Sequence, residues 1–327
     1  MTDSPHRFTE RIAHVNGIDL QILEAGDPTA PLILLSHGFP EGAWSWRHQL
    51  PVLAAAGYHV IAPYQRGYGN SPNPKDIEFY GVEHLGNDLL GLIDEAGQEQ
   101  AILVGHDWGA LITWDLARMH PERLKAVVGV SVPLVQWPSP PTDLFKMVYT
   151  DRFFYMLYFQ PVGPAETELE ADVRDSMAKF LWNASGAPAR PDMSGGLPPM
   201  EGTGVLTHMV EAPPLPWSWL TEDDLDRYVA DFTTSGFFGP VSYYRNLDGN
   251  YQVVKDLSVD RLTMPVYFIG GTNDMVNLMD PTGIERMTTV LPDFRGATVI
   301  PGIGHWTQQE DPEAFNAALL GFLATLD

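Results

Sequence analysis

The feature that most constrains the fold is a series of short apolar runs, rich in β-branched residues, separated by segments with helical spacing. Near-continuous apolar runs of this length are typical of parallel strands that are covered on both faces. The expected strands are 32–36, 59–63, 101–105, 126–132, 265–270 and 297–301. Helical spacing is found at 44–56, 80–96, 109–119 and 311–325. This alternation predicts βαβ units and a mostly parallel, doubly wound α/β sheet.

The N-terminal part of the chain has a different pattern. Residues 8–25 are typical of two strands joined at Asn16-Gly17, a dipeptide that favours a tight hairpin turn. We therefore expect an antiparallel hairpin ahead of the parallel strands.

The strand pattern is interrupted between about residues 137 and 250, after a Pro-rich cluster at 137–141. The interrupting segment is rich in aromatic residues and helical patterns, and Thr221 with Asp224 resembles a helix-starting capping box. Within it, 186–217 is dense in Pro and Gly, and excursions this long are usually functional. We predict an α/β core of residues 1–137 and 251–327, with a helical cap of residues 138–250 inserted into it.

Composition excludes several classes of function. The chain has 327 residues with 42 acidic and 19 basic ones, a net charge of −23 that argues against nucleic acid and anionic membrane surfaces as partners. It has no cysteine, which excludes disulfides, thiolate nucleophiles and Cys-based metal sites. The N-terminus has no apolar stretch of signal-peptide length, and no run reaches the length of a membrane span, so we expect a cytoplasmic protein.

A candidate nucleophile follows the expected strand at 101–105. Gly105-His106-Asp107-Trp108-Gly109 has the small-x-nucleophile-x-small pattern of a nucleophile elbow, with Asp107 where many hydrolases carry serine. Glycines on both sides permit a sharp strand-to-helix turn, and the start of a helix favours the ionised carboxylate. Alone, Asp107 would more simply be a helix cap.

Two further residues turn this elbow into a candidate triad. Asp274 comes just past the expected strand 265–270, and His305 just past 297–301. The order nucleophile, acid, histidine is the order that this type of elbow requires. Catalytic groups of open α/β sheets gather at the carboxyl ends of strands, so we expect these residues to meet.

The segment His37-Gly38-Phe39-Pro40 follows the first parallel strand. An α/β hydrolase carries its oxyanion-hole loop at this point, and the backbone N–H groups of Phe39 and Trp108 are the expected donors. We interpret His37 and His106 as structural. The side chains of Phe39, Trp108, Tyr158 and Trp306 are expected to line the substrate pocket.

Four motifs together resemble the epoxide hydrolases of the α/β-hydrolase fold, along nearly the whole chain. They are His37-Gly-Phe-Pro-Glu41, Arg66-Gly-Tyr-Gly-Asn-Ser71, Gly105-His-Asp-Trp-Gly109 and Gly304-His-Trp-Thr-Gln308. Two cap segments, Tyr155–Gln160 and Tyr243–Asn246, also resemble that family.

The resemblance implies one tyrosine from each cap segment to grip the epoxide oxygen. Motif position favours Tyr155 and Tyr244, with Tyr158 and Tyr243 as the alternatives within each pair. It also implies no cofactor and no metal, with an epoxide and water as partners. We expect an apolar or aromatic epoxide rather than an anionic one, because no cap arginine is clearly aimed at the site. The oligomeric state is left open, with a homodimer among the alternatives.

The expected chemistry has two steps. Asp107 attacks an epoxide carbon to form an alkyl ester while the tyrosines protonate the ring oxygen, and His305, oriented by Asp274, then activates a water that hydrolyses the ester to a vicinal diol. Serine would leave an ether that hydrolysis does not cleave, which explains the aspartate. The alternatives are a haloalkane or haloacid dehalogenase on the same fold, and a non-catalytic ligand-binding homologue.

Overall fold

The computed structural model describes residues 8–188 and 197–326, which contain one eight-stranded sheet in the order β1-β2-β4-β3-β5-β6-β7-β8. Strands β3 to β8 are mutually parallel, whereas β1 and β2 form an antiparallel hairpin that joins the sheet beside β4. The strands are β1 (Thr9–Val15), β2 (Ile18–Ala25), β3 (Leu32–Ser36), β4 (His59–Pro63), β5 (Ala101–His106), β6 (Leu124–Val130), β7 (Val266–Gly271) and β8 (Phe294–Ile300).

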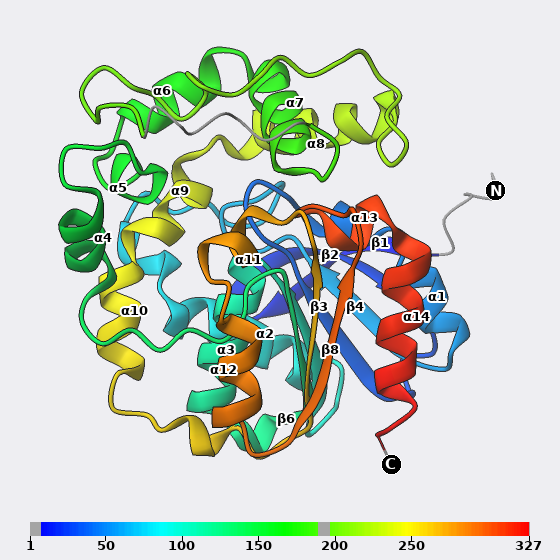
Figure 1. Cartoon of the computed structure of the whole chain (residues 1–327). Coiled ribbons are helices and arrows are strands. Elements are labelled where there is room, and N and C mark those ends of the chain that lie inside the picture. Colours follow the sequence, from blue (N-terminus) through cyan, green and yellow to red (C-terminus); the bar gives the residue numbers. More distant parts are fainter. Residues whose placement is uncertain (1–7, 189–196, 327) are drawn as a thin grey trace.

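Helices cover both faces of this sheet, as Figure 1 shows. On one face lie α1 (Leu50–Ala55) and α14 (Pro312–Leu323), and on the other lie α2 (Val82–Glu95), α3 (Trp108–Met119) and α12 (Gly283–Val290). Every residue of β3, β4 and β5 is buried between these layers. The doubly wound sheet predicted from the apolar runs is therefore present.

The expected hairpin turn is also present. Asn16 and Gly17 join β1 to β2 with positive φ angles of 50° and 74°, the backbone conformation that the Asn-Gly pair tolerates best.

The bounds of two expected strands differ from those of the observed strands. Strand β6 ends at Val130 rather than at residue 132, so the next two residues lie beyond the strand. Strand β8 begins at Phe294, three residues before the expected start, because it is an edge strand whose residues alternate between half-buried and exposed. A search for continuous apolar runs misses that alternation.

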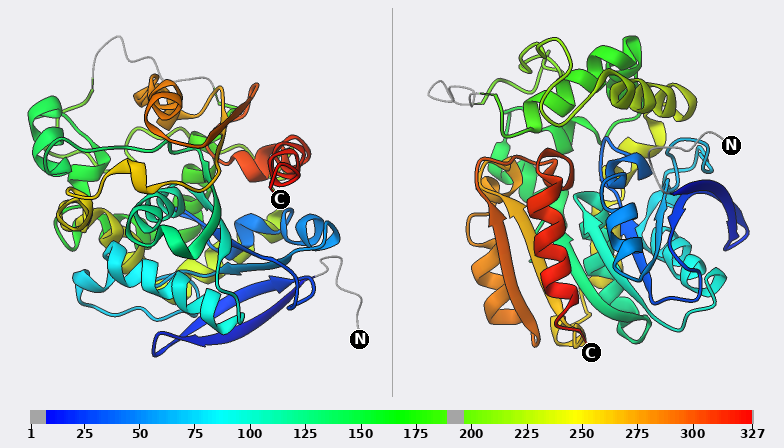
Figure 2. Two further views of the ribbon diagram at one scale, coloured as in Figure 1. Left: turned by 90° about the horizontal axis from the view of Figure 1, so that it is seen from below. Right: turned by 90° about the vertical axis from the view of Figure 1, so that its right-hand side faces the viewer.

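A layer of helices lies beyond the carboxyl ends of the parallel strands (Figures 1 and 2). Its last helix, α10, packs against α2 and α3 of the core. The helices of this part of the chain are α4 (Pro141–Tyr149), α5 (Tyr155–Tyr158), α6 (Pro164–Ala171), α7 (Val173–Ala184), α8 (Glu222–Ser235), α9 (Phe238–Arg245) and α10 (Leu247–Val254).

The predicted capping box starts α8. The hydroxyl of Thr221 accepts a hydrogen bond from the Asp224 backbone N–H at 3.2 Å, and the Asp224 carboxylate accepts one from the Thr221 N–H at 3.0 Å. These reciprocal bonds satisfy two of the N–H groups that a helix start leaves unpaired.

The Pro/Gly-rich excursion connects α7 to α8, and its residues 189–196 lie outside the described residues. The part from residue 197 onward contains no helix and runs beside the start of α5. Phe153 N–H donates to the Pro198 carbonyl at 2.8 Å, and Met200 N–H donates to that of Asp151 at 2.8 Å. Short, irregular pairing of this kind fixes a segment that has no regular structure of its own.

Among the described helices, none is both long enough and apolar enough to cross a membrane.

Candidate active site

Asp107 lies in the tight turn between β5 and α3. Its φ of 52° is positive, which is uncommon for a residue with a side chain and is found where surrounding structure holds the backbone in place. Packing explains the flanking glycines: a Cβ at Gly105 would come within 2.2 Å of the Gly109 carbonyl, and one at Gly109 within 2.1 Å of that of Ser36. The turn therefore requires glycine on both sides and presents Asp107 above the sheet.

Two groups face the Asp107 carboxylate. The Phe39 backbone N–H donates to Oδ1 at 2.8 Å, and His305 Nε2 lies 3.6 Å from Oδ2. Trp108, the first residue of α3, adds one of the N–H groups that have no partner within a helix. The two backbone groups expected to form an oxyanion hole thus flank Asp107.

His305 is held on its other side by two residues. Nδ1 lies 3.2 Å from Asp274 Oδ1 and 2.8 Å from the hydroxyl of Ser131. Asp274 is fully buried, and the same Oδ1 accepts the backbone N–H of Val276 at 2.9 Å. Asp107, His305 and Asp274 are therefore brought together in the arrangement that their order along the chain predicts.

Ser131 was missed in the sequence, because the expected strand 126–132 would have contained it. Strand β6 ends at Val130, the residue before Ser131, and Ser131 adopts a φ of 69° that turns its buried hydroxyl toward His305. A polar residue at the carboxyl end of a buried parallel strand is the signal that could have identified it.

The charges of the site shift the pKa values of its central pair. Burial alone would raise the pKa of Asp107, but His305, the charge of His106 and the Phe39 N–H outweigh burial and lower it. Burial alone would lower the pKa of His305, but Asp274 and Asp107 raise it well above its ordinary value. Both shifts favour the charged forms of the pair, a carboxylate beside an imidazolium.

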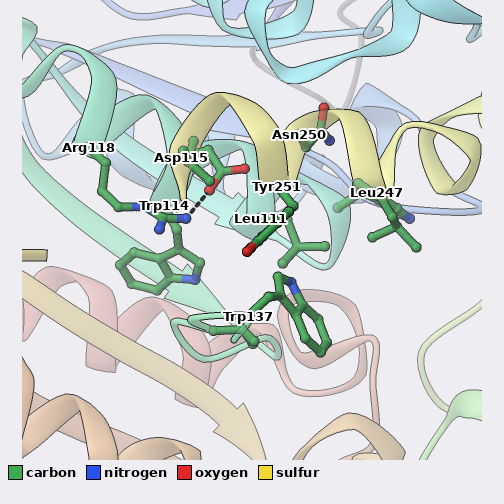
Figure 3. Close-up of a pocket in the computed structure, with 11 residues that line it drawn as sticks. Leu111, Trp114, Asp115, Arg118, Trp137, Leu247, Asn250 and Tyr251 are labelled. Carbon is green, nitrogen blue, oxygen red and sulfur yellow. Dashed lines mark hydrogen bonds and ion pairs between the residues drawn. The ribbon is translucent and has the colours of Figure 1, made fainter. Parts of the chain in front are cut away.

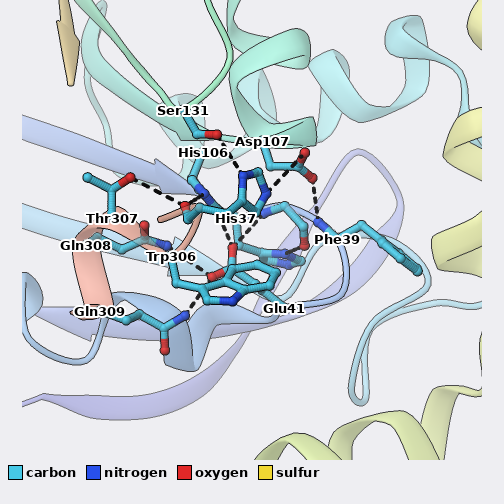
Figure 4. Close-up of polar contacts among 12 residues, drawn as sticks. His37, Phe39, Glu41, His106, Asp107, Ser131, Trp306, Thr307, Gln308 and Gln309 are labelled. Atoms are coloured by element: carbon cyan, nitrogen blue, oxygen red, sulfur yellow. Dashed lines mark hydrogen bonds and ion pairs between the residues drawn. The ribbon is translucent and has the colours of Figure 1, made fainter. Parts of the chain in front are cut away.

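A buried polar network lies behind His305 (Figure 4). His106 donates from Nε2 to the His305 backbone carbonyl at 2.8 Å, and its Nδ1 lies 2.6 Å from the Glu41 carboxylate. Glu41 also accepts the side-chain amides of Gln308 and Gln309 at 3.0 and 2.8 Å. These bonds tie the loop that carries His305 to the loop that carries Phe39.

The second histidine, His37, has a separate structural role. Its Nε2 accepts the Gln65 backbone N–H at 3.1 Å, and burial lowers its pKa to about 4, so the ring stays neutral. His37 and His106 thus contact backbone groups around the site, in accord with the structural interpretation given to both.

Of the four candidate tyrosines, Tyr155 and Tyr244 line the cavity that contains Asp107 and His305. Their rings contact each other with centroids 5.7 Å apart. Burial, reinforced by the Asp107 charge, raises the pKa of both phenols, which keeps their protons in place.

The other two tyrosines use their hydroxyls elsewhere. Tyr158 donates to Glu168 at 2.8 Å, and Tyr243 donates to the Arg66 backbone carbonyl at 2.9 Å. Each pair therefore separates into one residue that faces the cavity and one that does not.

The cavity has a volume of about 440 Å³ and is mostly apolar, which is a size that suits a small organic ligand. Phe39 and Trp306 line it, as expected. Trp108 and Tyr158 do not, which corrects that part of the prediction. The Trp108 ring packs edge-on against Tyr244 at 5.0 Å and so supports a lining residue, whereas Tyr158 is turned toward Glu168.

A much smaller cavity of about 30 Å³ is lined mainly by residues of α3 and α10 (Figure 3). Asp115 and Arg118 form an ion pair at its edge, and burial raises the pKa of Asp115 to about 6. A volume close to that of a single water excludes this cavity as a substrate site.

Tyr64, the residue after β4, connects the core to helix α8 of the cap. Its hydroxyl accepts from Arg227 of α8 at 2.8 Å, and Arg227 also pairs with Glu10 of β1 at 2.9 Å. Arg66 has a structural role: its guanidinium binds the Asp88 carboxylate through two bonds of 2.8 Å.

Comparisons with known proteins agree with this geometry. A family model described as the alpha/beta hydrolase fold matches residues 31–312. Epoxide hydrolase A of Mycobacterium tuberculosis is 42% identical over 322 residues, which cover 98% of both chains. Epoxide hydrolase B of the same organism is 38% identical and covers 92% of this chain and 93% of its own.

Solved structures give the same result. The crystal structure of epoxide hydrolase A from Mycobacterium thermoresistibile matches with a TM-score of 0.90 at 41% identity, covering 98% of this chain and 99% of that one. An epoxide hydrolase from an endophytic Streptomyces matches with a TM-score of 0.91 at 36% identity, covering 98% and 96%. The expected α/β-hydrolase fold is confirmed, and the chain belongs to the epoxide hydrolase family of that fold.

Proposed function

We propose that this protein hydrolyses epoxides to vicinal diols, with Asp107 as covalent nucleophile. The observation that carries the proposal is one cavity lined by Asp107, His305, Tyr155 and Tyr244. A carboxylate beside a histidine suits covalent catalysis in general, while two phenols facing it suit an oxygen leaving group. The relatives named above are epoxide hydrolases, which supports the same reaction.

The first step opens the ring. One carboxylate oxygen of Asp107 attacks an epoxide carbon, the carbon–oxygen bond of the ring breaks, and an alkyl ester forms. The electron pair of the broken bond goes to the ring oxygen, which receives hydrogen bonds from Tyr155 and Tyr244 and one proton from one of them, leaving that residue as a tyrosinate. Because the pKa of both phenols is raised, the tyrosines hold their protons until the stronger alkoxide base develops.

The second step releases the product. Forming the ester removes the negative charge of Asp107, one of the two charges that raise the pKa of His305. The pKa of His305 therefore falls in the ester. Its proton passes to the tyrosinate left by ring opening, which restores the tyrosine and leaves a neutral ring that can act as a base.

His305, still oriented by Asp274, then takes a proton from water. The resulting hydroxide adds to the ester carbonyl, and the backbone N–H groups of Phe39 and Trp108 receive the developing oxyanion. Collapse of this intermediate breaks the carbonyl–alkoxide bond, restores the Asp107 carboxylate and frees the diol.

The experiment combines product analysis with trapping. Purified wild-type protein should convert epoxides such as styrene oxide to diols, and Asp107→Asn should not. His305→Gln should retain ring opening and accumulate an adduct on the peptide that contains Asp107, detected by mass spectrometry. Halide release from haloalkanes, with no diol from any epoxide, would replace this proposal with a dehalogenase. Neither product nor adduct would favour a ligand-binding homologue.

A further inference from the structure

We propose that residues 197–210, here called the wall segment, select the substrate by packing against a long, uncharged aliphatic substituent of the epoxide. This inference rests on the proposed function, because it assigns a substrate class to the same cavity. The wall segment is the described middle part of the Pro/Gly-rich excursion, for which the catalytic mechanism has no use.

The wall segment contributes side chains directly to the cavity. Leu197, Val205 and Met209 line it, although they lie far along the chain from Asp107 and His305. None of the three carries an ionisable group or a hydrogen-bond donor in its side chain. Their contribution to the cavity is apolar surface, which favours a substituent that is itself apolar.

Glu168 of α6 anchors the wall segment through backbone bonds. Its Oε2 accepts the Val205 N–H at 2.9 Å, and its Oε1 accepts the Leu206 N–H at 3.0 Å. Gly204 is packed so closely that an added Cβ would lie 2.2 Å from the same carboxylate. Val205 is thereby fixed at the cavity wall by a charged acceptor, which makes stronger hydrogen bonds than a neutral one.

Asn183 of α7 provides a second anchor. Its side-chain amide donates to the Val210 carbonyl at 2.8 Å and accepts the Val210 N–H at 2.9 Å. Asn183 itself lines the cavity, but these two bonds engage its donor and its acceptor with the wall segment. Its amide is therefore committed to holding Met209 in place.

The first anchor also reaches the proposed proton donor. Glu168 Oε2 accepts the Tyr158 hydroxyl at 2.8 Å, and Tyr158 belongs to the short helix α5 that carries Tyr155. One carboxylate therefore joins the wall to the helix of a proposed catalytic residue. Tyr158 is a positioning residue in this arrangement, which accounts for its turning away from the cavity.

Two methionines extend the apolar lining of the cavity toward the protein surface. Met275 and Met279 of α11 (Met275–Met279) line the cavity and are 44% and 50% exposed, so an aliphatic surface continues to the outside. Methionine adapts to ligands of varied shape. Among the lining residues of the described chain there is no lysine or arginine to neutralise an anion. These features favour a flexible hydrocarbon chain over a carboxylate-bearing or short polar substituent.

The test compares two terminal epoxides, 1,2-epoxybutane and 1,2-epoxydecane, that share the reacting ring and differ in chain length. For wild-type protein we expect a higher kcat/KM with epoxydecane. The double variant Val205→Ala/Met209→Ala should lower the epoxydecane-to-epoxybutane ratio of kcat/KM about tenfold or more, since each lost apolar contact discriminates to this degree. The decrease in kcat/KM for epoxydecane should appear mainly as a higher KM.

Matched controls separate selection from general damage. Val210→Ala truncates an exposed residue of the same segment and should leave the ratio unchanged. Glu168→Gln should lower the ratio, whereas Glu211→Gln, the same change at an exposed residue just beyond the wall segment, should not. Thermal unfolding of each variant shows whether it is folded at the assay temperature.

The outcomes are distinguishable. The wall proposal is overturned, and the proposed function is left intact, by either of two results. In the first, diol forms but the double variant and Glu168→Gln leave the epoxydecane-to-epoxybutane ratio of kcat/KM unchanged. In the second, wild-type protein reacts faster with epoxybutane. No diol from either epoxide with wild-type protein overturns the wall proposal, and it overturns the proposed function only if styrene oxide and other epoxides also give no diol.

Discussion

Replacing Tyr244 by phenylalanine tests the proposed grip on the epoxide oxygen. The variant keeps the ring, which packs against Trp108 and Phe39 at 5.0 and 5.4 Å, and removes only the hydroxyl. Tyr244 is 3% exposed, so water cannot replace the lost donor easily. Removing one such donor from a water-excluded site lowers the rate about 10²–10³-fold. Because Tyr155 still donates to the epoxide oxygen, we expect a loss of about a hundredfold, at the lower end of this range.

The neighbouring residue supplies the matched control. Tyr243→Phe removes a hydroxyl that donates to the Arg66 carbonyl rather than into the cavity. It should lower the free energy of unfolding by about 1–3 kcal/mol, because a buried carbonyl loses its partner, and leave ring opening nearly unchanged. The assay is a rapid-quench measurement of the covalent ester in a single turnover. Equal losses in the two variants, or Tyr244→Phe within twofold of wild type, would refute the assignment.

Three further predictions concern the partners of these residues. Asp274→Asn should slow ester hydrolysis far more than ring opening, so that the ester accumulates in steady state and is seen by mass spectrometry; unchanged ester levels would argue against its orienting role. Glu41→Ala leaves the buried His106 without its carboxylate and should lower the free energy of unfolding by about 3–5 kcal/mol in denaturant titration. Burial raises the pKa of Asp231 from 3.8 to about 6, so the folded chain binds more protons between about pH 4 and pH 6 and loses stability as pH rises through that window. Asp231→Asn removes this pH dependence, and above pH 6 its free energy of unfolding should exceed that of wild type by up to about 3 kcal/mol. The measurement is the melting temperature of both proteins against pH, and a difference in melting temperature that does not change with pH would contradict the prediction.

The catalytic arrangement was largely predictable from the sequence because it depends on strand ends. Asp107 and Asp274 each follow a buried apolar strand and His305 follows the edge strand β8, and parallel strands bring such ends to one edge of the sheet. The Phe39 N–H follows from the same reasoning, since its loop also leaves a strand at that edge. Local pattern and topology were enough to place these groups together.

Motif position favours Tyr155 and Tyr244, but the reason why the other two tyrosines turn away from the cavity lies in three-dimensional contacts. Tyr155 and Tyr158 lie at opposite ends of a single helical turn, and the Glu168 carboxylate that engages Tyr158 comes from another helix. Tyr243 faces the Arg66 carbonyl for a similar long-range reason. Spacing along the chain carries no information about these partners.

The pocket wall was the least predictable part of the site. Trp108 was expected there, but as the first residue of α3 it packs its ring behind Tyr244 and leaves only its backbone N–H beside Asp107. Val205 and Met209 belong to a segment without regular structure, and their positions depend on Glu168 and Asn183. Irregular segments have no periodicity from which to infer which side chains point inward.

The most direct test of the central claim is a single turnover in water labelled with oxygen-18, with enzyme in excess over epoxide. If Asp107 forms the ester and water attacks its carbonyl, the first diol carries an unlabelled carboxylate oxygen, and the label enters the Asp107 side chain. Mass spectrometry of the peptide containing Asp107 should then show a two-dalton increase, and later turnovers should give labelled diol. A labelled diol in the first turnover with an unlabelled Asp107 would show that water attacks the epoxide directly, and would contradict the covalent mechanism.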